Sequence, residues 1–495
     1  MATRSPDASG ADDEQDLDLS ELLRGANAKD ETATLLRSSL PVVLSTTTQL
    51  LIMVPLMSAV GGLGKVALAS MNLVSIYSGL AGVAPLSGLA MALDSLCSQA
   101  YTAASDRRVL GLYLQRVLVA LALALLALFP LWWSAQSVYR AAGVPEEIAR
   151  ATGRMLRLYF FGVAGMFVFE CLKSFLFAQG IRRFAPIAQA VCLPVSWLCI
   201  YLLISNPATS LGFLGVPCVI IATAVGFNLV TLAFIAWVDG HQCWRGWSCA
   251  ALAGLGPIFW LGAAGSAITF FESVSLHMID IGVLFLDPSS MAAQAILSTV
   301  LTGWWFLGTG FAVATCNRIG NLLGAGQPNR ALLAVWTALG VAVVIFVVLG
   351  AALAWNCRAA AAVFTDDPEV VDIIASHMAW PAAGGAVQGI SMVASGVLRG
   401  QGRQALTARI RMAAFVGVSV PLSALAVATL RWGLAGLWLG YVMGALLAMC
   451  AQVYAVLTTD WGREVELCRR RLSDHESALH THALEDSEAS RILAF

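Results

Sequence analysis

The chain has 495 residues, of which 58% are hydrophobic and only 12% are charged. About a quarter of the residues in a soluble domain are charged, so this composition excludes an ordinary soluble protein and predicts a polytopic membrane protein. The apolar runs are long and do not alternate, which favours membrane-spanning helices over the strands of a barrel. The formal net charge of −1 says nothing about partners, because the charges lie in loops and tails. The eleven cysteines show no CxxC pairing, which indicates small core residues.

Twelve apolar runs are each long enough for a membrane-spanning helix of about 20 residues. They cover residues 39–61, 66–97, 109–134, 155–179, 185–206, 212–238, 252–285, 291–316, 331–355, 371–397, 406–430 and 433–457. The acidic run ADDEQDLDLSE predicts that residues 1–38 form a disordered tail and not a signal peptide. We expect residues 239–251 to link two halves of the chain, and residues 458–495 to form a polar tail.

The placement of arginines predicts the orientation in the membrane. Arginines follow the second, fourth, eighth, tenth and twelfth spans, among them Arg107, Arg182, Arg318, Arg399 and Arg469. The positive-inside rule therefore puts both termini in the cytoplasm, although the loop after the third span also carries arginines, interrupted by glutamates. Neither tail has a targeting signal that distinguishes a protein of the plasma membrane from one of the vacuolar membrane.

An internal repeat divides the chain into two halves. VPEEIARATGRML at 144–156 is similar to DPEVVDIIASHMA at 367–379, and FLFAQGIRR at 175–183 is similar to VLRGQGRQA at 397–405. The offset of about 223 residues spans six helices, an even number, so the halves are parallel repeats. The sequence thus predicts an all-α protein with an N-terminal lobe at 39–238 and a C-terminal lobe at 252–457.

Three motifs carry a resemblance to a known family: ALDSLCSQAY at 92–101, RIGNLLGAG at 318–326 and SGVLRGQGRQ at 395–404. They resemble the eukaryotic branch of the multidrug and toxic compound extrusion family, and the third is closest to fungal members. The resemblance implies a V-shaped antiporter of twelve helices in two lobes, which exports organic, often cationic or amphipathic, solutes in exchange for protons or sodium. It implies no cofactor, no nucleic-acid partner and a monomer in the lipid bilayer.

The stretch FFESVSLHMID at 270–280 places Glu272, His277 and Asp280 inside an apolar run. A charge at mid-bilayer costs about 3 kcal/mol or more, so it normally faces a cavity or a partner. Five residues of a helix turn through about 500°, which leaves Glu272 and His277 about 140° apart and on different faces. The resemblance implies that Glu272 exchanges a proton for a cationic substrate, with His277 tuning that proton. A role as a structural brace stays open for Glu272, and we expect one for Asp280.

The chain departs from the family pattern at Gln388. Members typically carry an acid seven residues before the SGVLRG-like motif, and an amide there binds substrate but carries no proton. The first span also lacks the aspartate of many prokaryotic members. Coupling therefore falls to Glu272 alone or with His277, or the stoichiometry has changed.

Other polar residues of the spans are candidates for a cleft or a gate. The offset pairs Gln49 with Glu272 and Asp94 with Asn317, and Gln99 lies in the same motif as Asp94. Glu170 and Lys173 are three apart on one helix face, which predicts a structural pair. The aromatic residues Trp304, Trp305 and Phe306 suit an organic cation, although aromatic residues also anchor helices at membrane interfaces.

Patterns of enzymes are absent from the sequence. GLGK at 62–65 lacks the GxxxxGK[ST] spacing of a phosphate loop, and the histidines lack metal-binding spacing. The sequence therefore predicts a proton-coupled exporter and not an enzyme. The alternatives are a sodium-coupled exporter and a lipid-precursor flippase, whose relatives usually have a cavity rich in basic residues; the spans here contain few.

Overall fold

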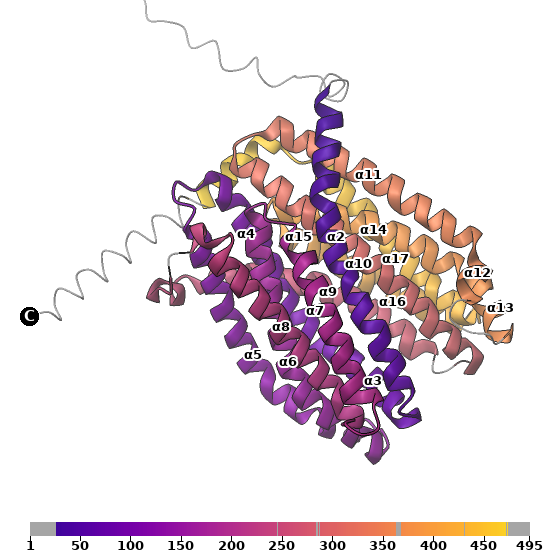
Figure 1. Ribbon diagram of the computed structural model, residues 1–495. Coiled ribbons are helices and arrows are strands. Elements are labelled where there is room, and N and C mark those ends of the chain that lie inside the picture. Colours follow the sequence, from indigo (N-terminus) through magenta and orange to yellow (C-terminus); the bar gives the residue numbers. More distant parts are fainter. Residues whose placement is uncertain are drawn as a thin grey trace, which may run out of the picture.

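The computed structural model describes residues 26–244, 246–283, 286, 288–362, 368–429, 431–471 and 473. Within them all regular secondary structure is helical, and twelve helices are long and apolar enough to span a membrane. Two bundles lean together beside the first half of the first helix and spread apart towards their opposite ends, giving a V shape (Figure 1). The predicted all-α architecture with twelve spans is confirmed.

The first bundle contains α2 (Ala26–Gly61), α3 (Lys65–Ser78), η1 (Gly79–Val83), α4 (Ala84–Ala103), α5 (Val109–Ala141), α6 (Glu146–Ala178), α7 (Phe184–Ile200), η2 (Tyr201–Ser205), η3 (Gly212–Leu214) and α8 (Gly215–Trp237). The short turns η4 (His241–Cys243) and η5 (Cys249–Leu252) connect it to the second bundle. That bundle contains α9 (Leu255–Gly282), α10 (Pro288–Gly324), α11 (Pro328–Trp355), α12 (Cys357–Ala362), α13 (Pro368–His377), α14 (Ala379–Gly400), α15 (Gln404–Arg411), η7 (Met412–Ser419), α16 (Val420–Ala428) and α17 (Gly433–Leu457).

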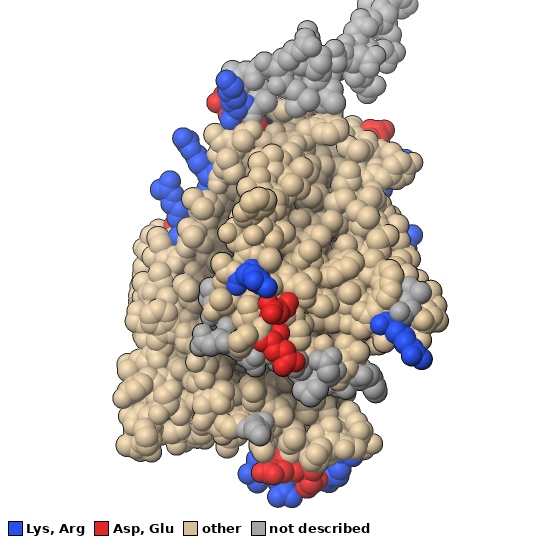
Figure 2. All heavy atoms as spheres, turned by 90° about the vertical axis from the view of Figure 1, so that its right-hand side faces the viewer, with Lys and Arg blue, Asp and Glu red and all other residues tan. Residues whose placement is uncertain are grey.

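The surface has the distribution expected of a membrane protein. Most of the face in Figure 2 carries neither acidic nor basic side chains. Many large apolar side chains are exposed, including Trp237, Trp260 and Trp355, which are 83%, 74% and 89% exposed. Contiguous apolar surface of this kind requires a lipid environment.

The core consists of two main hydrophobic clusters, and the first helix of each bundle contributes to both. Leu35 near the start of α2 packs in the cluster of the second bundle, whereas Leu56 near its end packs in that of the first. Conversely, Ile258 at the start of α9 packs in the first cluster and Ile279 in the second. Each crossing helix therefore connects both bundles, and a displacement of one bundle reaches the other through it.

The crossing of α9 over α4 depends on glycines. A Cβ atom built on Gly265 would lie 2.8 Å from the Cα atom of Gly88. Ser87 donates a hydrogen bond to Thr269 at 3.0 Å, and Ser266 donates to the Pro85 carbonyl at 2.5 Å. Small residues that let helix backbones approach, with polar side chains between them, are typical of membrane helix interfaces.

The second span is interrupted by the π-helical segment η1. Such a segment frees backbone carbonyl groups that a membrane cannot hydrate. The indole nitrogen of Trp132 donates a hydrogen bond to the Ala81 carbonyl at 2.8 Å, which satisfies one of them.

Several predicted boundaries are wrong. Helix α2 begins at Ala26, so residues 26–38 are helical, whereas residues 1–25 of the predicted acidic tail lie outside the described residues. Two arginines predicted in loops lie inside helices: Arg318 in α10 and Arg399 in α14. Arg318 pairs with Glu31 of α2 at 2.6 Å. Positive charge near a span end therefore did not identify a loop. Arg318 has the buried partner Glu31, and Arg399 lines a cavity between the two bundles.

The predicted polar C-terminal tail begins with a helix, at residues 461–471, and the part beyond 473 lies outside the described residues. Trp461, Val465 and Cys468 of this helix are buried in the second cluster. Glu464 has a side chain only 9% exposed and lies 3.8 Å from Arg403 and 3.9 Å from Arg471. The helix therefore packs against the loop between α14 and α15.

The docking of this helix is expected to depend on pH. Burial raises the pKa of Glu464 from its ordinary 4.5, and the attraction of Arg403 and Arg471 only partly opposes the shift. Because the folded state binds this proton more readily than the unfolded chain, docking is strongest below about pH 4.5 and weakens as the pH rises through the raised pKa. Limited proteolysis of the C-terminal segment should therefore speed up from pH 5 to pH 8 severalfold more in the wild type than in Glu464→Gln. An equal increase in both would contradict this prediction.

Candidate functional site

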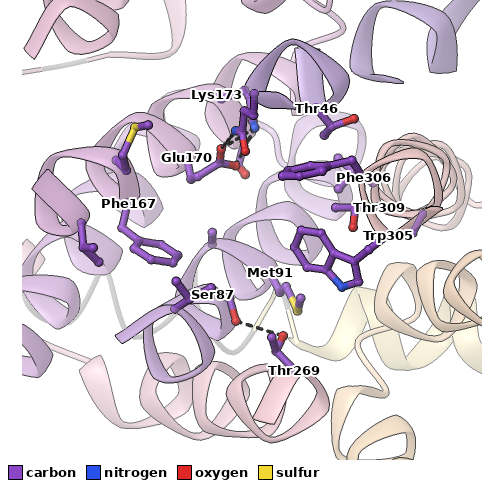
Figure 3. Close-up of a pocket in the computed structure, with 18 of the residues that line it drawn as sticks. Thr46, Ser87, Met91, Phe167, Glu170, Lys173, Thr269, Trp305, Phe306 and Thr309 are labelled. Atoms are coloured by element: carbon purple, nitrogen blue, oxygen red, sulfur yellow. Dashed lines mark hydrogen bonds and ion pairs between the residues drawn. The ribbon is translucent and has the colours of Figure 1, made fainter. Parts of the chain in front are cut away.

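A cavity of about 410 Å³ lies between the two bundles, lined by residues of both. Its walls are mostly apolar. They include the methionines Met53, Met57, Met71, Met91, Met166 and Met392, and the aromatic residues Tyr159, Phe167, Phe177, Trp305 and Phe306. Figure 3 shows Trp305 and Phe306 projecting from α10 into this space. Trp304 does not join them, because it is buried against Phe346, with ring centroids 6.0 Å apart.

Six charged side chains line the cavity: the acids Asp94, Glu170 and Glu272 and the bases Lys173, Arg399 and Arg411. The three negative and three positive charges balance. The spans contain few basic residues, as the sequence analysis noted, and three of them line this cavity. The lining is mostly apolar with a small number of polar and charged groups, which is typical of a site for small molecules.

Glu272 is buried on α9, and both of its oxygens have partners. Gln388 of α14 donates its amide nitrogen to Oε1 at 2.5 Å, and Arg411 of α15 pairs with Oε2. All three side chains are buried. The Glu272 carboxylate is therefore neutralised by Arg411, a partner that the sequence analysis did not identify. Gln388, the departure from the family pattern, directly contacts the carboxylate.

The first bundle has a related cluster. Gln49 of α2 donates to Glu170 of α6 at 3.4 Å, and the Lys173 ammonium lies 2.6 Å from the same carboxylate (Figure 3). Each cluster thus combines an amide, a carboxylate and a cation, and joins the first and fourth spans of its bundle. The amide is on the first span and the carboxylate on the fourth in the first bundle, whereas the second bundle has the carboxylate on its first span and the amide on its fourth. The two bundles therefore have related clusters in which the amide and the carboxylate are exchanged.

Asp94, Gln99 and Asn317 lie where α4 meets the second bundle. Asp94 is 3% exposed, and its Oδ1 atom has no hydrogen-bond partner among the described residues. Gln99 donates to the Gly400 carbonyl at 2.7 Å. Asn317 donates to the Val313 carbonyl of its own helix at 3.1 Å. Asp94 lines the cavity, whereas Gln99 and Asn317 do not.

His277 and Asp280 are separate from the Glu272 cluster. The His277 Nδ1 atom lies 3.5 Å from Asp280, and Asp280 accepts hydrogen bonds from Gln294 at 3.2 Å and Ser298 at 3.3 Å. Neither His277 nor Asp280 lines the cavity. The His277 ring instead faces η1, with Nε2 3.2 Å from the position of a Cβ atom on Gly79. The structure therefore does not bring His277 to the carboxylate that it was expected to assist.

Sequence reasoning missed Arg399 and Arg411 as residues of the site. Both lie near predicted span ends, and the positive-inside rule accounted for Arg399 as a loop residue. A signal was available in Arg411, because it is the sixth residue of the predicted span 406–430. An arginine within a span normally faces a cavity or pairs with a buried acid or carbonyl group, and Glu272 was a candidate partner.

The comparisons with known proteins agree with this architecture. The model of the MatE family matches residues 41–202 and 266–425, which is most of the chain. The chain belongs to the MatE family. This member is 28% identical over 444 residues to the uncharacterized transporter C4B3.13 of Schizosaccharomyces pombe, covering 90% of this chain and 82% of the relative. It is 26% identical over 468 residues to Protein DETOXIFICATION 16 of Arabidopsis thaliana, covering 93% and 95%.

The crystal structure of the eukaryotic MATE transporter AtDTX14 has the same fold as this MatE protein. The TM-score is 0.84 at 22% identity, with 90% of this chain and 99% of that chain covered. The resemblance read from the sequence motifs is confirmed. The protein is therefore a multi-pass membrane transporter of a family of efflux transporters.

Proposed function

We propose that the protein exports amphipathic organic solutes in exchange for protons, by alternating access of the cavity between the bundles. The observation that carries this proposal is the buried Glu272 facing the cavity, held by Arg411 and Gln388. A proton on Glu272 removes its attraction for Arg411 and for a bound cation alike. Proton binding and solute binding are then alternatives at one carboxylate, so proton entry favours solute release, which is the requirement for exchange.

The charge balance of the cavity supports a broader substrate class than cations alone. The three acids are matched in number by three bases, so the lining carries no net charge, and binding depends largely on apolar contact with methionines and aromatic rings. A cavity of about 410 Å³ suits a drug-sized solute. The same two features favour a solute exporter over a lipid-precursor flippase, for which a predominantly basic cavity is typical.

The hydrogen-bonding partners of Glu272 favour protons over sodium. Sodium in transporters is held by oxygen atoms, often backbone carbonyls of unwound helices. Here the two oxygens of Glu272 accept from the nitrogen atoms of Gln388 and Arg411. A proton needs only one of the lone pairs that remain on the carboxylate, whereas a sodium ion needs several oxygen ligands.

We also infer from the placement of the arginines that both termini face the cytoplasm.

Uptake of a fluorescent organic cation into proteoliposomes with an imposed proton gradient tests the proposal. We expect gradient-driven uptake in the wild type and at least a tenfold loss, about 1.4 kcal/mol, in Glu272→Gln. Asp280→Asn is the matched control, because Asp280 lies on the same helix outside the cavity, and it should keep most of the uptake. Undiminished proton-driven uptake by Glu272→Gln would refute the role of Glu272, and a sodium gradient that replaces the proton gradient would refute proton coupling.

A further inference from the structure

The end of the cavity nearest the α14–α15 loop contains one buried acid and one buried base from opposite bundles. Asp94 on α4 is 3% exposed and Arg399 on α14 is 4% exposed, and both line the cavity. The Asp94 Oδ1 atom and the Arg399 Nε atom have no hydrogen-bond partner among the described residues. The two side chains do not form an ion pair, but their opposite charges attract each other across the boundary between the bundles.

Backbone contacts show that this boundary is closed at the same place. Helix α14 ends at Gly400, and the last carbonyl groups of a helix lack partners within the helix. Ser95 donates to the Arg399 carbonyl at 2.7 Å, and Gln99 donates to the Gly400 carbonyl at 2.7 Å. Gln404 donates back to Ser95 at 2.9 Å. The first bundle thus caps a helix end of the second, and separation of the bundles removes these caps.

The charges around Asp94 come from two helices. On α6, Ser174 lies beside Asp94, and the charges of Lys173 and Glu170 act on Asp94 with opposite signs. Lys173 and Glu170 are paired with each other at 2.6 Å, so their influence on Asp94 largely cancels. From α14, Arg399 faces Asp94, and among the described residues no carboxylate lies within ion-pair distance of Arg399. The net attraction acting on Asp94 is therefore directed at the opposite bundle.

We propose that Asp94 and Arg399 form an electrostatic switch that holds this end of the cavity closed while Asp94 is ionised. Charges in a low-dielectric interior interact strongly beyond contact distance. A proton on Asp94, or a cationic group of a solute against it, removes the attraction and leaves only the hydrogen bonds of Ser95, Gln99 and Gln404. Asp94 is thus a second coupling residue, separate from Glu272, which acts on the closure between bundles. The inference rests on the proposed function, because it supplies the gate for alternating access.

A native cysteine reports on this closure. Cys316 of α10 is fully buried, and its sulfur atom lies 3.9 Å from the Ser95 hydroxyl of α4. Cys171 of α6 is equally buried but lies within the core of the first bundle. Opening of the boundary exposes Cys316 alone, whereas unfolding exposes both thiols. The alkylation rate of each with N-ethylmaleimide, measured by mass spectrometry of its peptide at constant pH, separates the two events.

We expect Asp94→Asn and Arg399→Gln each to speed alkylation of Cys316 roughly tenfold without changing that of Cys171. The double variant should be no faster than the faster single variant, because the two charges act as one pair. Arg399→Lys keeps the charge and should stay close to wild type. Unchanged Cys316 reactivity in Asp94→Asn, or additive effects in the double variant, would overturn the switch.

Two further outcomes are decisive. If Arg399→Gln speeds the alkylation of both Cys316 and Cys171, that variant unfolds. The comparison of Asp94→Asn with the wild type then tests the switch by itself. The alkylation assay needs no transport, so failure of proton-driven uptake refutes the proposed function and leaves the Cys316 result to test the switch. Conversely, normal uptake with an unresponsive Cys316 refutes the switch only.

Discussion

Replacing Arg411 with methionine is expected to lower the free energy of unfolding by about 3–5 kcal/mol, the largest effect of any single substitution proposed for this chain. Arg411 and Glu272 are both buried and form an ion pair. Methionine fills most of the volume but leaves the Glu272 carboxylate without a cation in the membrane interior. Gln388 still donates one hydrogen bond, which does not neutralise the charge. Chemical unfolding in a mild detergent, followed by circular dichroism, measures the difference.

The double variant Glu272→Gln with Arg411→Met provides the decisive comparison. Removing both charges of a buried pair is often close to neutral, so most of the lost stability should return. Arg409→Met is the matched control, because Arg409 is an exposed arginine of the same short helix, and it should change stability by less than about 0.5 kcal/mol. Equal losses of unfolding free energy in Arg411→Met and Arg409→Met would show that the ion pair does not stabilise the fold.

The sequence predicted the number and order of spans because hydropathy reflects a strong physical requirement. Backbone groups in a bilayer must be hydrogen bonded inside the protein, mostly within their own helix, so apolar length identifies spans. Span ends were less predictable. Helix α2 begins at Ala26, thirteen residues before the predicted start, because its first turns pack on α10, where Glu31 pairs with Arg318. Such a contact depends on tertiary structure that hydropathy does not contain.

The site was predictable only in part, for a similar reason. Glu272 could be selected from the cost of a charge within a span, and the repeat related it to Gln49. The partners of Glu272 lie 116 and 139 residues away, at Gln388 and Arg411. Sequence spacing carries no information about such pairs. His277 was associated with Glu272 because it is near in the chain, yet the helix turns it towards η1. Proximity in a helical sequence predicts a shared site only at spacings of three or four residues.

The other large effect is expected from Gly265→Val. The new Cβ atom would lie 2.8 Å from the Gly88 Cα atom and 3.0 Å from its carbonyl oxygen, and neither backbone atom can rotate away. The side chain must push α9 from α4, which typically costs about 1–3 kcal/mol in a well-packed core. Because Glu272 is seven residues further along α9, about two helical turns, this displacement also moves the carboxylate relative to Gln388 and Arg411. We therefore expect lower stability together with reduced proton-driven uptake.

Gly340→Ala distinguishes this steric effect from the general cost of changing a glycine within a span. Gly340 is an exposed residue in the middle of α11, where a Cβ atom would have no neighbour within 4 Å, and alanine favours a helix over glycine by about 1 kcal/mol. This variant should be as stable as the wild type or more stable, with unchanged uptake. If Gly265→Val behaved like Gly340→Ala, the close crossing would not determine how the bundles fit together. Loss of uptake by Gly265→Val alone, with Glu272 intact, would mean that the position of α9 across both bundles, and not only the charge that it carries, determines transport.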